Sequence, residues 1–154
     1  MRKQNGGFTL IEVLVSVVII SIGLLGMASL MITSLKQSNA EVMQTQAMQS
    51  GASMIEKLRS LPNVSFVSSF DSIPSPVDCE ESDCSTESMR DYYIREWKCL
   101  LGNYVEKCNI DADLVVLPEG DAKIVSDNGL ITITIKWLNI VTGDEYSWEV
   151  QSDD

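Results

Sequence analysis

The chain has 154 residues, with 22 acidic and 11 basic side chains and no histidine, which gives a formal net charge of −11 at pH 7. After Leu61 the imbalance is sharper, with six basic and nineteen acidic residues and a net charge of −13. Nucleic-acid surfaces are normally basic, so this composition argues against such a ligand. The lack of histidine also removes the commonest general base and metal ligand.

A short basic leader, residues 1–5, is followed by Gly6-Gly7-Phe8-Thr9-Leu10-Ile11-Glu12 and then by 23 uncharged residues, Val13 to Leu35. About 20 apolar residues suffice to cross a bilayer, so this run predicts a membrane span rather than a core helix. A secretory signal has a shorter apolar stretch with its cleavage site behind it. Glu12 is costly at a membrane boundary, and such a charge usually marks a function with a partner.

Beyond Lys36 the sequence remains helical in character but becomes amphipathic, with apolar residues at spacings of three and four. Because Pro62 is the first proline, we predict one helix from about Thr9 to Leu61. Its residues 8–35 would be the transmembrane half and its residues 36–61 the amphipathic half. Gly23 and Gly26 are the expected place for bending, since glycine weakens a helix interior by about 1 kcal/mol.

Residues 62–154 contain all four cysteines, Cys79, Cys84, Cys99 and Cys108. An even count in an exported domain favours disulfides, and the spacings lack the CxxC pairs of a zinc site. A helix from Thr86 to Asn103, capped by Ser85, would hold Cys84 and Cys99 about 22 Å apart, beyond the reach of a disulfide. Of the two remaining connectivities, Cys79–Cys84 with Cys99–Cys108 is favoured because both pairs close local loops.

The last third predicts a three-stranded antiparallel meander with strands at Ala122 to Ser126, Leu130 to Leu138 and Tyr146 to Val150. Asp127-Asn128-Gly129 is a strong hairpin signal, and the second strand alternates isoleucine with polar residues. In the loop before the helix, Val64 to Phe70 is a candidate edge strand. The expected fold class is α+β, with the long helix covering the apolar face of the sheet.

Catalytic motifs are missing from the sequence, which has no P-loop, dinucleotide fingerprint or nucleophile elbow. Asp111-Ala112-Asp113 resembles the start of a calcium loop but lacks the later ligands, so it predicts a solvated turn. Glu80, Glu81 and Asp83 could together bind calcium, but their composition favours an exposed acidic loop. We therefore expect no enzyme, no cofactor and no metal site.

The segment Gly6 to Val15 resembles the N-terminal signal of type IV pilins and of type II secretion pseudopilins. The continuation Ile20 to Ala28 is more particularly similar to minor pilins of the PilV type. Three pieces of the head resemble the same subfamily: Glu96-Trp97-Lys98-Cys99-Leu100, Leu117-Pro118-Glu119-Gly120 and Ile135-Lys136-Trp137.

This resemblance implies that a prepilin peptidase removes the leader, residues 1–7, by cutting between Gly7 and Phe8, and then N-methylates Phe8. It implies that Glu12 pairs with the terminal amine of a neighbouring subunit. The implied fold is a lollipop whose acidic head, residues 62–154, lies in the periplasm while the helix crosses the inner membrane. The implied partners are other minor pilins, the major pilin and the inner-membrane assembly platform, with final residence in the pilus.

Two departures from major pilins favour a minor subunit: the apolar half has no kinking proline, and no cysteine follows Cys108. The favoured role is a minor pilin that primes pilus assembly and is located at the tip. The alternative is a minor pseudopilin of a type II secretion system. A third possibility is an adhesive module built on Tyr92, Tyr93, Trp97, Trp137 and Trp148, although aromatics at these spacings more often form core.

Overall fold

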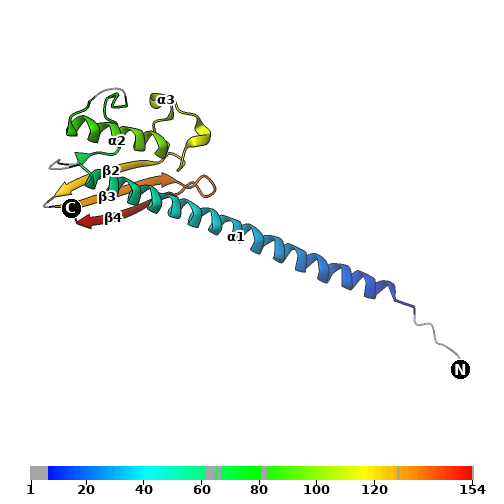
Figure 1. Cartoon of the computed structure of the whole chain (residues 1–154). Helices are drawn as coiled ribbons and strands as arrows, with labels where there is room; N and C mark the ends of the chain where they lie inside the picture. The colour runs from blue at the N-terminus through cyan, green and yellow to red at the C-terminus, as the bar shows by residue number, and fades with distance from the viewer. Residues whose placement is uncertain (1–6, 62–64, 66, 81–82, 128, 154) are drawn as a thin grey trace. The chain divides into compact units, whose positions relative to one another are not determined.

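The computed structural model describes residues 7–61, 65, 67–80, 83–127 and 129–153, with no side-chain description for Asp153. Two compact units are present, Met1–Asn39 and Ala40–Asp154. Helix α1, Leu10–Arg59, contributes residues to both units (Figure 1).

Helix α1 is 50 residues long, and its start and end agree with the predicted helix to within two residues. The absence of proline lets the backbone hydrogen bonds continue through Gly23 and Gly26, which leave the helix uninterrupted. Lys57 and Arg59 lie in its last turn, where positive charge interacts favourably with the helix dipole.

In the second unit, α1 turns one face towards a sheet. The buried residues of this face recur every three or four positions, as a helix covering a sheet requires. They are Ala47, Gly51, Met54, Ile55 and Leu58. The predicted amphipathic pattern is therefore confirmed for this part of the helix.

The sheet is antiparallel and has the strand order β1-β2-β3-β4. The strands are β1 (Val67–Ser68), β2 (Asp121–Asp127), β3 (Leu130–Leu138) and β4 (Glu145–Asp153). The predicted meander is confirmed as β2, β3 and β4, with strands slightly longer than predicted. Of the candidate edge strand, the described part forms only the short β1; Val64 and Phe66, like Asn128 of the predicted turn, lie outside the described residues.

The segment between β1 and β2 contains α2 (Thr86–Leu101), α3 (Val105–Cys108) and a short 3-10 helix η1 (Ala112–Leu114). Ser85 is the N-cap of α2, and its side chain accepts a hydrogen bond from the backbone N–H of Ser88 (3.2 Å). The helix ends earlier than predicted because Gly102 adopts a φ of 127°, which a residue with a side chain rarely does.

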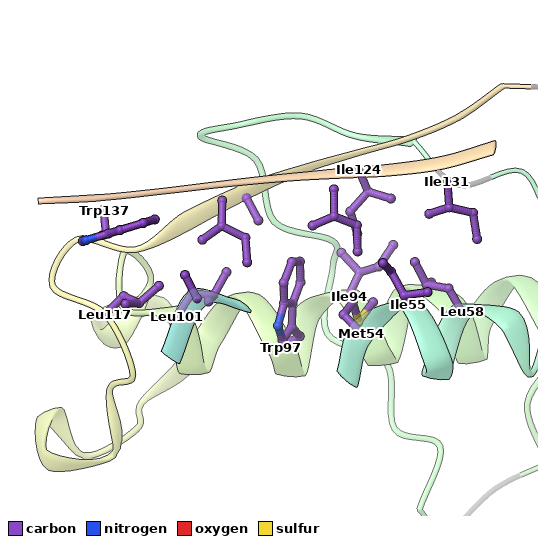
Figure 2. Packing of buried hydrophobic residues seen from close by; sticks show 14 residues of the cluster. Met54, Ile55, Leu58, Ile94, Trp97, Leu101, Leu117, Ile124, Ile131 and Trp137 are labelled. Atoms are coloured by element: carbon purple, nitrogen blue, oxygen red, sulfur yellow. The ribbon is translucent and has the colours of Figure 1, made fainter. Parts of the chain in front are cut away.

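The core lies between the sheet and the two helices α1 and α2 (Figure 2). From α1 come Met54, Ile55 and Leu58, and from α2 come Ile94, Trp97 and Leu101. Both sets of side chains point at the isoleucines of β2 and β3. One face of the sheet is thus covered by both helices.

Gly51 is needed for the close approach of α1 to β4. A Cβ atom at this position would lie 2.5 Å from Cζ3 of Trp148 and 3.3 Å from Cδ1 of Ile135. Real Cβ contacts are not that short, so any side chain here would displace the indole. The glycine that weakens the helix therefore makes room for an aromatic residue of the sheet.

Candidate processing and assembly segment

The predicted cleavage residues Gly7 and Phe8 lie just before α1 and are exposed. Gly7 has no atom within 4 Å of where a Cβ would be, and Phe8 is 83% exposed. Residues 7–9 are not helical; α1 begins at Leu10, with the carbonyl of Thr9 accepting from the backbone N–H groups of Glu12 and Val13. The bond between Gly7 and Phe8 therefore lies outside regular structure, in an exposed segment that an enzyme can reach.

Glu12 lies in the first turn of α1. A carboxylate is favourable there because the free N–H groups of the first turn carry partial positive charge. No salt bridge joins Glu12 to another side chain among the described residues.

Three hydroxyl groups of the apolar half are hydrogen-bonded within the helix. Ser16, Ser21 and Thr33 each donate to the carbonyl four residues earlier, at 2.6, 2.7 and 3.0 Å. A hydroxyl that is already hydrogen-bonded costs less to place in hydrocarbon. These three residues are therefore compatible with a membrane environment.

Large apolar side chains cover the first unit and are exposed from Phe8 to Leu35. By length and composition α1 is able to cross a membrane. A soluble domain would not leave such a surface uncovered. The segment therefore fits a single-pass membrane anchor.

In the second unit, disulfides join Cys79 to Cys84 and Cys99 to Cys108, with Cα–Cα distances of 5.6 and 5.8 Å. These are the two pairs favoured on the sequence. The second disulfide ties the end of α2 to α3, and Cys99 is buried. Persistent disulfides are typical of proteins outside the cytoplasm.

A buried ion pair, which the sequence pattern did not predict, joins α2 to β2. Nζ of Lys98 lies 3.1 Å from Oδ1 of Asp121, and both side chains are fully buried. Lys98 also donates to the carbonyls of Ser69 and Ser72, each at 2.6 Å. The ammonium group therefore has three oxygen partners and fastens the segment after β1 to the helix.

The Asp121 carboxylate accepts three hydrogen bonds in addition to its ion pair with Lys98. Its Oδ2 accepts from the backbone N–H of Asp71 (2.6 Å) and from the hydroxyl of Tyr104 (3.2 Å), and its Oδ1 accepts from the N–H of Ala122 (2.7 Å). Burial lowers the pKa of Lys98, while the charge of Asp121 opposes that shift. Burial, followed by the charge of Asp121, raises the pKa of Tyr104.

One signal for this pair was present in the sequence. Lys98 lies four residues after Ile94 and three before Leu101, so it belongs to the apolar stripe of α2. A lysine within such a stripe needs a buried acidic partner. The identity of that partner depends on how α2 meets β2, which the sequence does not state.

In the described part of the acidic segments, the carboxylates make local hydrogen bonds. Asp111 caps η1, with its carboxylate accepting from the N–H of Asp113 (3.4 Å), as a solvated turn does. Glu80 accepts from the hydroxyl of Tyr92 (3.0 Å), and Glu81 lies outside the described residues. Within the described ranges, no group of three or more histidine, cysteine, aspartate or glutamate side chains could hold a metal ion.

The five aromatic residues considered for adhesion do not form an exposed patch. Trp97 and Trp137 are buried, and Tyr93 and Trp148 pack against the core. Tyr92 is partly buried and donates a hydrogen bond to Glu80. Four of these five aromatic side chains therefore belong to the core or pack against it.

Residues 2–28 match the family model for the prokaryotic N-terminal methylation motif. The chain carries a type IV pilin-type signal. The match ends within the first part of α1, and no curated protein and no solved structure gives a significant match to the chain. A prepilin-type signal implies processing by a prepilin peptidase and membrane-associated assembly. Together with the α+β fold it suggests a structural role.

Proposed function

We propose that this protein is a minor pilin that primes the assembly of a type IV pilus together with other minor pilins and remains at the pilus tip. The observation that carries the proposal is the methylation motif at residues 2–28, which leads directly into a membrane-length helix with exposed apolar side chains. The similarity of Ile20 to Ala28 and of the head to PilV-type minor pilins favours a pilus over a secretion pseudopilus.

Processing would occur between Gly7 and Phe8. A residue without a side chain lets the peptidase approach the backbone closely, and nothing in the described structure surrounds Gly7. The cut would remove the basic leader and create a new amine on Phe8, which the peptidase would then methylate.

Glu12 would pair with that amine on a neighbouring subunit. An isolated carboxylate is costly at low dielectric, and so is an isolated amine, but the two attract strongly when subunits stack. Because Glu12 is fixed in the first turn of α1, the pair would set the axial register between subunits. The amine exists only after cleavage, so assembly would depend on processing.

The head would be exported to the periplasm before assembly. Its two disulfides and its high acidity suit an oxidising compartment outside the cytoplasm and a soluble exposed domain. The expected partners are the prepilin peptidase, other minor pilins, the major pilin and the inner-membrane assembly platform.

The test is deletion of the gene in the native host, with complementation by the wild-type chain. Loss of surface pili and of twitching motility is the expected result. Intact pili together with lost protein secretion would reject the pilus and identify the chain as a pseudopilin. The mature protein should begin at N-methylated Phe8 by mass spectrometry; retention of Met1 or cleavage after Leu35 would reject the whole class.

A further inference from the structure

The part of α1 that belongs to the second unit is unusual because it has no charge between Glu41 and Glu56. The rest of that unit is strongly charged, with a net −13 after Leu61. A solvent-facing helix surface normally carries charged residues. Here six exposed and uncharged residues follow one another at helical spacing, namely Val42, Thr45, Gln46, Gln49, Ala52 and Ser53. We call these six residues the uncharged stripe.

A groove adjoins this stripe. Its volume is about 330 Å³, and one wall consists of glutamine and serine side chains of α1 (Gln46, Gln49, Ser50 and Ser53), with Lys57 also lining it. The other wall is apolar and consists of Trp97, Leu100 and Val116. The groove therefore offers amides and hydroxyls on one side and hydrocarbon on the other.

Side-chain contacts join the two walls of the groove. The indole N–H of Trp97 donates to Oγ of Ser50 at 2.7 Å, which joins α2 to α1. Lys57 is already engaged, because its Nζ lies 3.6 Å from a carboxylate oxygen of Glu96 and 5.4 Å from the ring centre of Tyr93. The one charged side chain on the groove wall thus already has an acidic partner.

We propose that the uncharged stripe and this groove form the surface through which the head binds a second, different subunit of the pilin type. A partly apolar, uncharged helix surface loses little on dehydration compared with a charged one, and amide and hydroxyl groups can pair with a partner helix. Apolar side chains of the partner would fill the space beside Leu100, which is 37% exposed.

The charge of the head decides between a different subunit and a second copy. Two copies would bring together two acidic heads of −13 each, and the uncharged stripe supplies no cation to offset their repulsion. A partner with a neutral or basic head meets no such repulsion. This inference rests on the proposed function, because it identifies the surface used in the assembly of minor pilins.

The test uses the full-length chain in the membranes of its native host, with a photo-crosslinking amino acid in place of Ser53. The expected adduct contains a different protein, identified by mass spectrometry as carrying its own N-terminal methylation motif. The same amino acid in place of Ser147, which is exposed on β4 and points away from α1, should give no such adduct.

A matched pair of substitutions tests whether binding depends on the uncharged stripe. Gln49→Glu places a charge on the groove wall and should reduce the Ser53 adduct at least tenfold. Gln44→Glu makes the same change at an exposed position of the same helix, but five residues away and therefore about 140° around the helix axis. It should leave the adduct unchanged, and tryptophan fluorescence should show that both variants remain folded.

The outcomes separate this inference from the proposed function. An adduct only with a second copy, an adduct only with lipid, or equal effects of the two substitutions would overturn the inference. The absence of any adduct in cells that still require the gene for piliation would overturn the inference and leave the proposed function standing. Normal piliation after deletion would overturn the proposed function, whatever is crosslinked.

Discussion

In the first unit the large apolar side chains of α1 are exposed from Leu10 to Leu35, whereas in the second unit the apolar face of the same helix is buried against a sheet. The first unit has no core of its own among its described residues, and its exposed apolar surface fits a membrane anchor. The second unit has its own core, two disulfides and a buried ion pair. Substitutions in the first unit should therefore change processing and assembly, and substitutions in the second should change stability.

The largest expected effect is at the cleavage site. Gly7→Glu should abolish processing, because a long charged side chain would block the close approach of the peptidase. Mass spectrometry of the membrane-bound protein would then show only the uncut precursor. Gly23→Ala is the matched control: no atom lies within 4 Å of its added Cβ, and it should be processed normally. Efficient cleavage of the Gly7 variant would contradict the assignment of the site.

Glu12→Ala should separate processing from assembly. The cut site is unchanged, so N-methylated Phe8 should still be found, but the amine of the neighbouring subunit would lack its carboxylate. Co-purification with other pilin-type subunits should fall at least tenfold. Glu12→Asp keeps the charge and should retain part of the assembly. Wild-type recovery of partners by the alanine variant would rule out the charge pair.

In the second unit the largest effect is expected at the buried ion pair. Asp121→Asn leaves the charge of Lys98 buried and without its counterion, which should cost about 3 to 5 kcal/mol of unfolding free energy. Urea denaturation of the full chain in detergent can be followed by tryptophan fluorescence, since Trp97, Trp137 and Trp148 all lie in this unit. Glu96→Gln breaks the half-exposed pair with Lys57 and should cost less than about 1 kcal/mol.

The partners of Lys98 in the buried ion pair could not be predicted from the sequence, whereas most of the fold could. The long helix, α2 with its Ser85 cap and the meander are encoded by local patterns, namely the lack of proline, a capping serine and alternating isoleucines, and all of them were predictable. The signal around Glu12 is local too. The contacts of Lys98 with Asp121, Ser69 and Ser72 join segments that lie far apart in the chain, so they follow from tertiary packing alone. The same holds for the groove between α1 and α2.

The two disulfides should contribute unequally to the stability of the second unit. The loop between Cys99 and Cys108 has a sequence separation of 9, and that between Cys79 and Cys84 a separation of 5. Chain entropy gives about 2.6 kcal/mol for the longer loop and about 2.1 kcal/mol for the shorter one. Replacing both cysteines of each pair by alanine tests this difference in urea denaturation. A larger loss from the Cys79–Cys84 pair would show that loop length does not control their contributions.

The smallest effect is expected at Gly51, where two terms oppose each other. Alanine is more favourable than glycine in a helix by about 1 kcal/mol, but its Cβ would lie 2.5 Å from the indole of Trp148. That indole is a stiff ring, so it must shift as a whole, at a cost of about 1 to 3 kcal/mol. Gly51→Ala should therefore destabilise the second unit by about 1 kcal/mol and change the fluorescence of Trp148. Ser53→Ala lies on the exposed side of the same helix and meets no such clash. It should be slightly stabilising, because alanine has the higher helix propensity. If both variants were stabilised equally, α1 could move away from β4, and the close packing at Gly51 would not be a requirement of the fold.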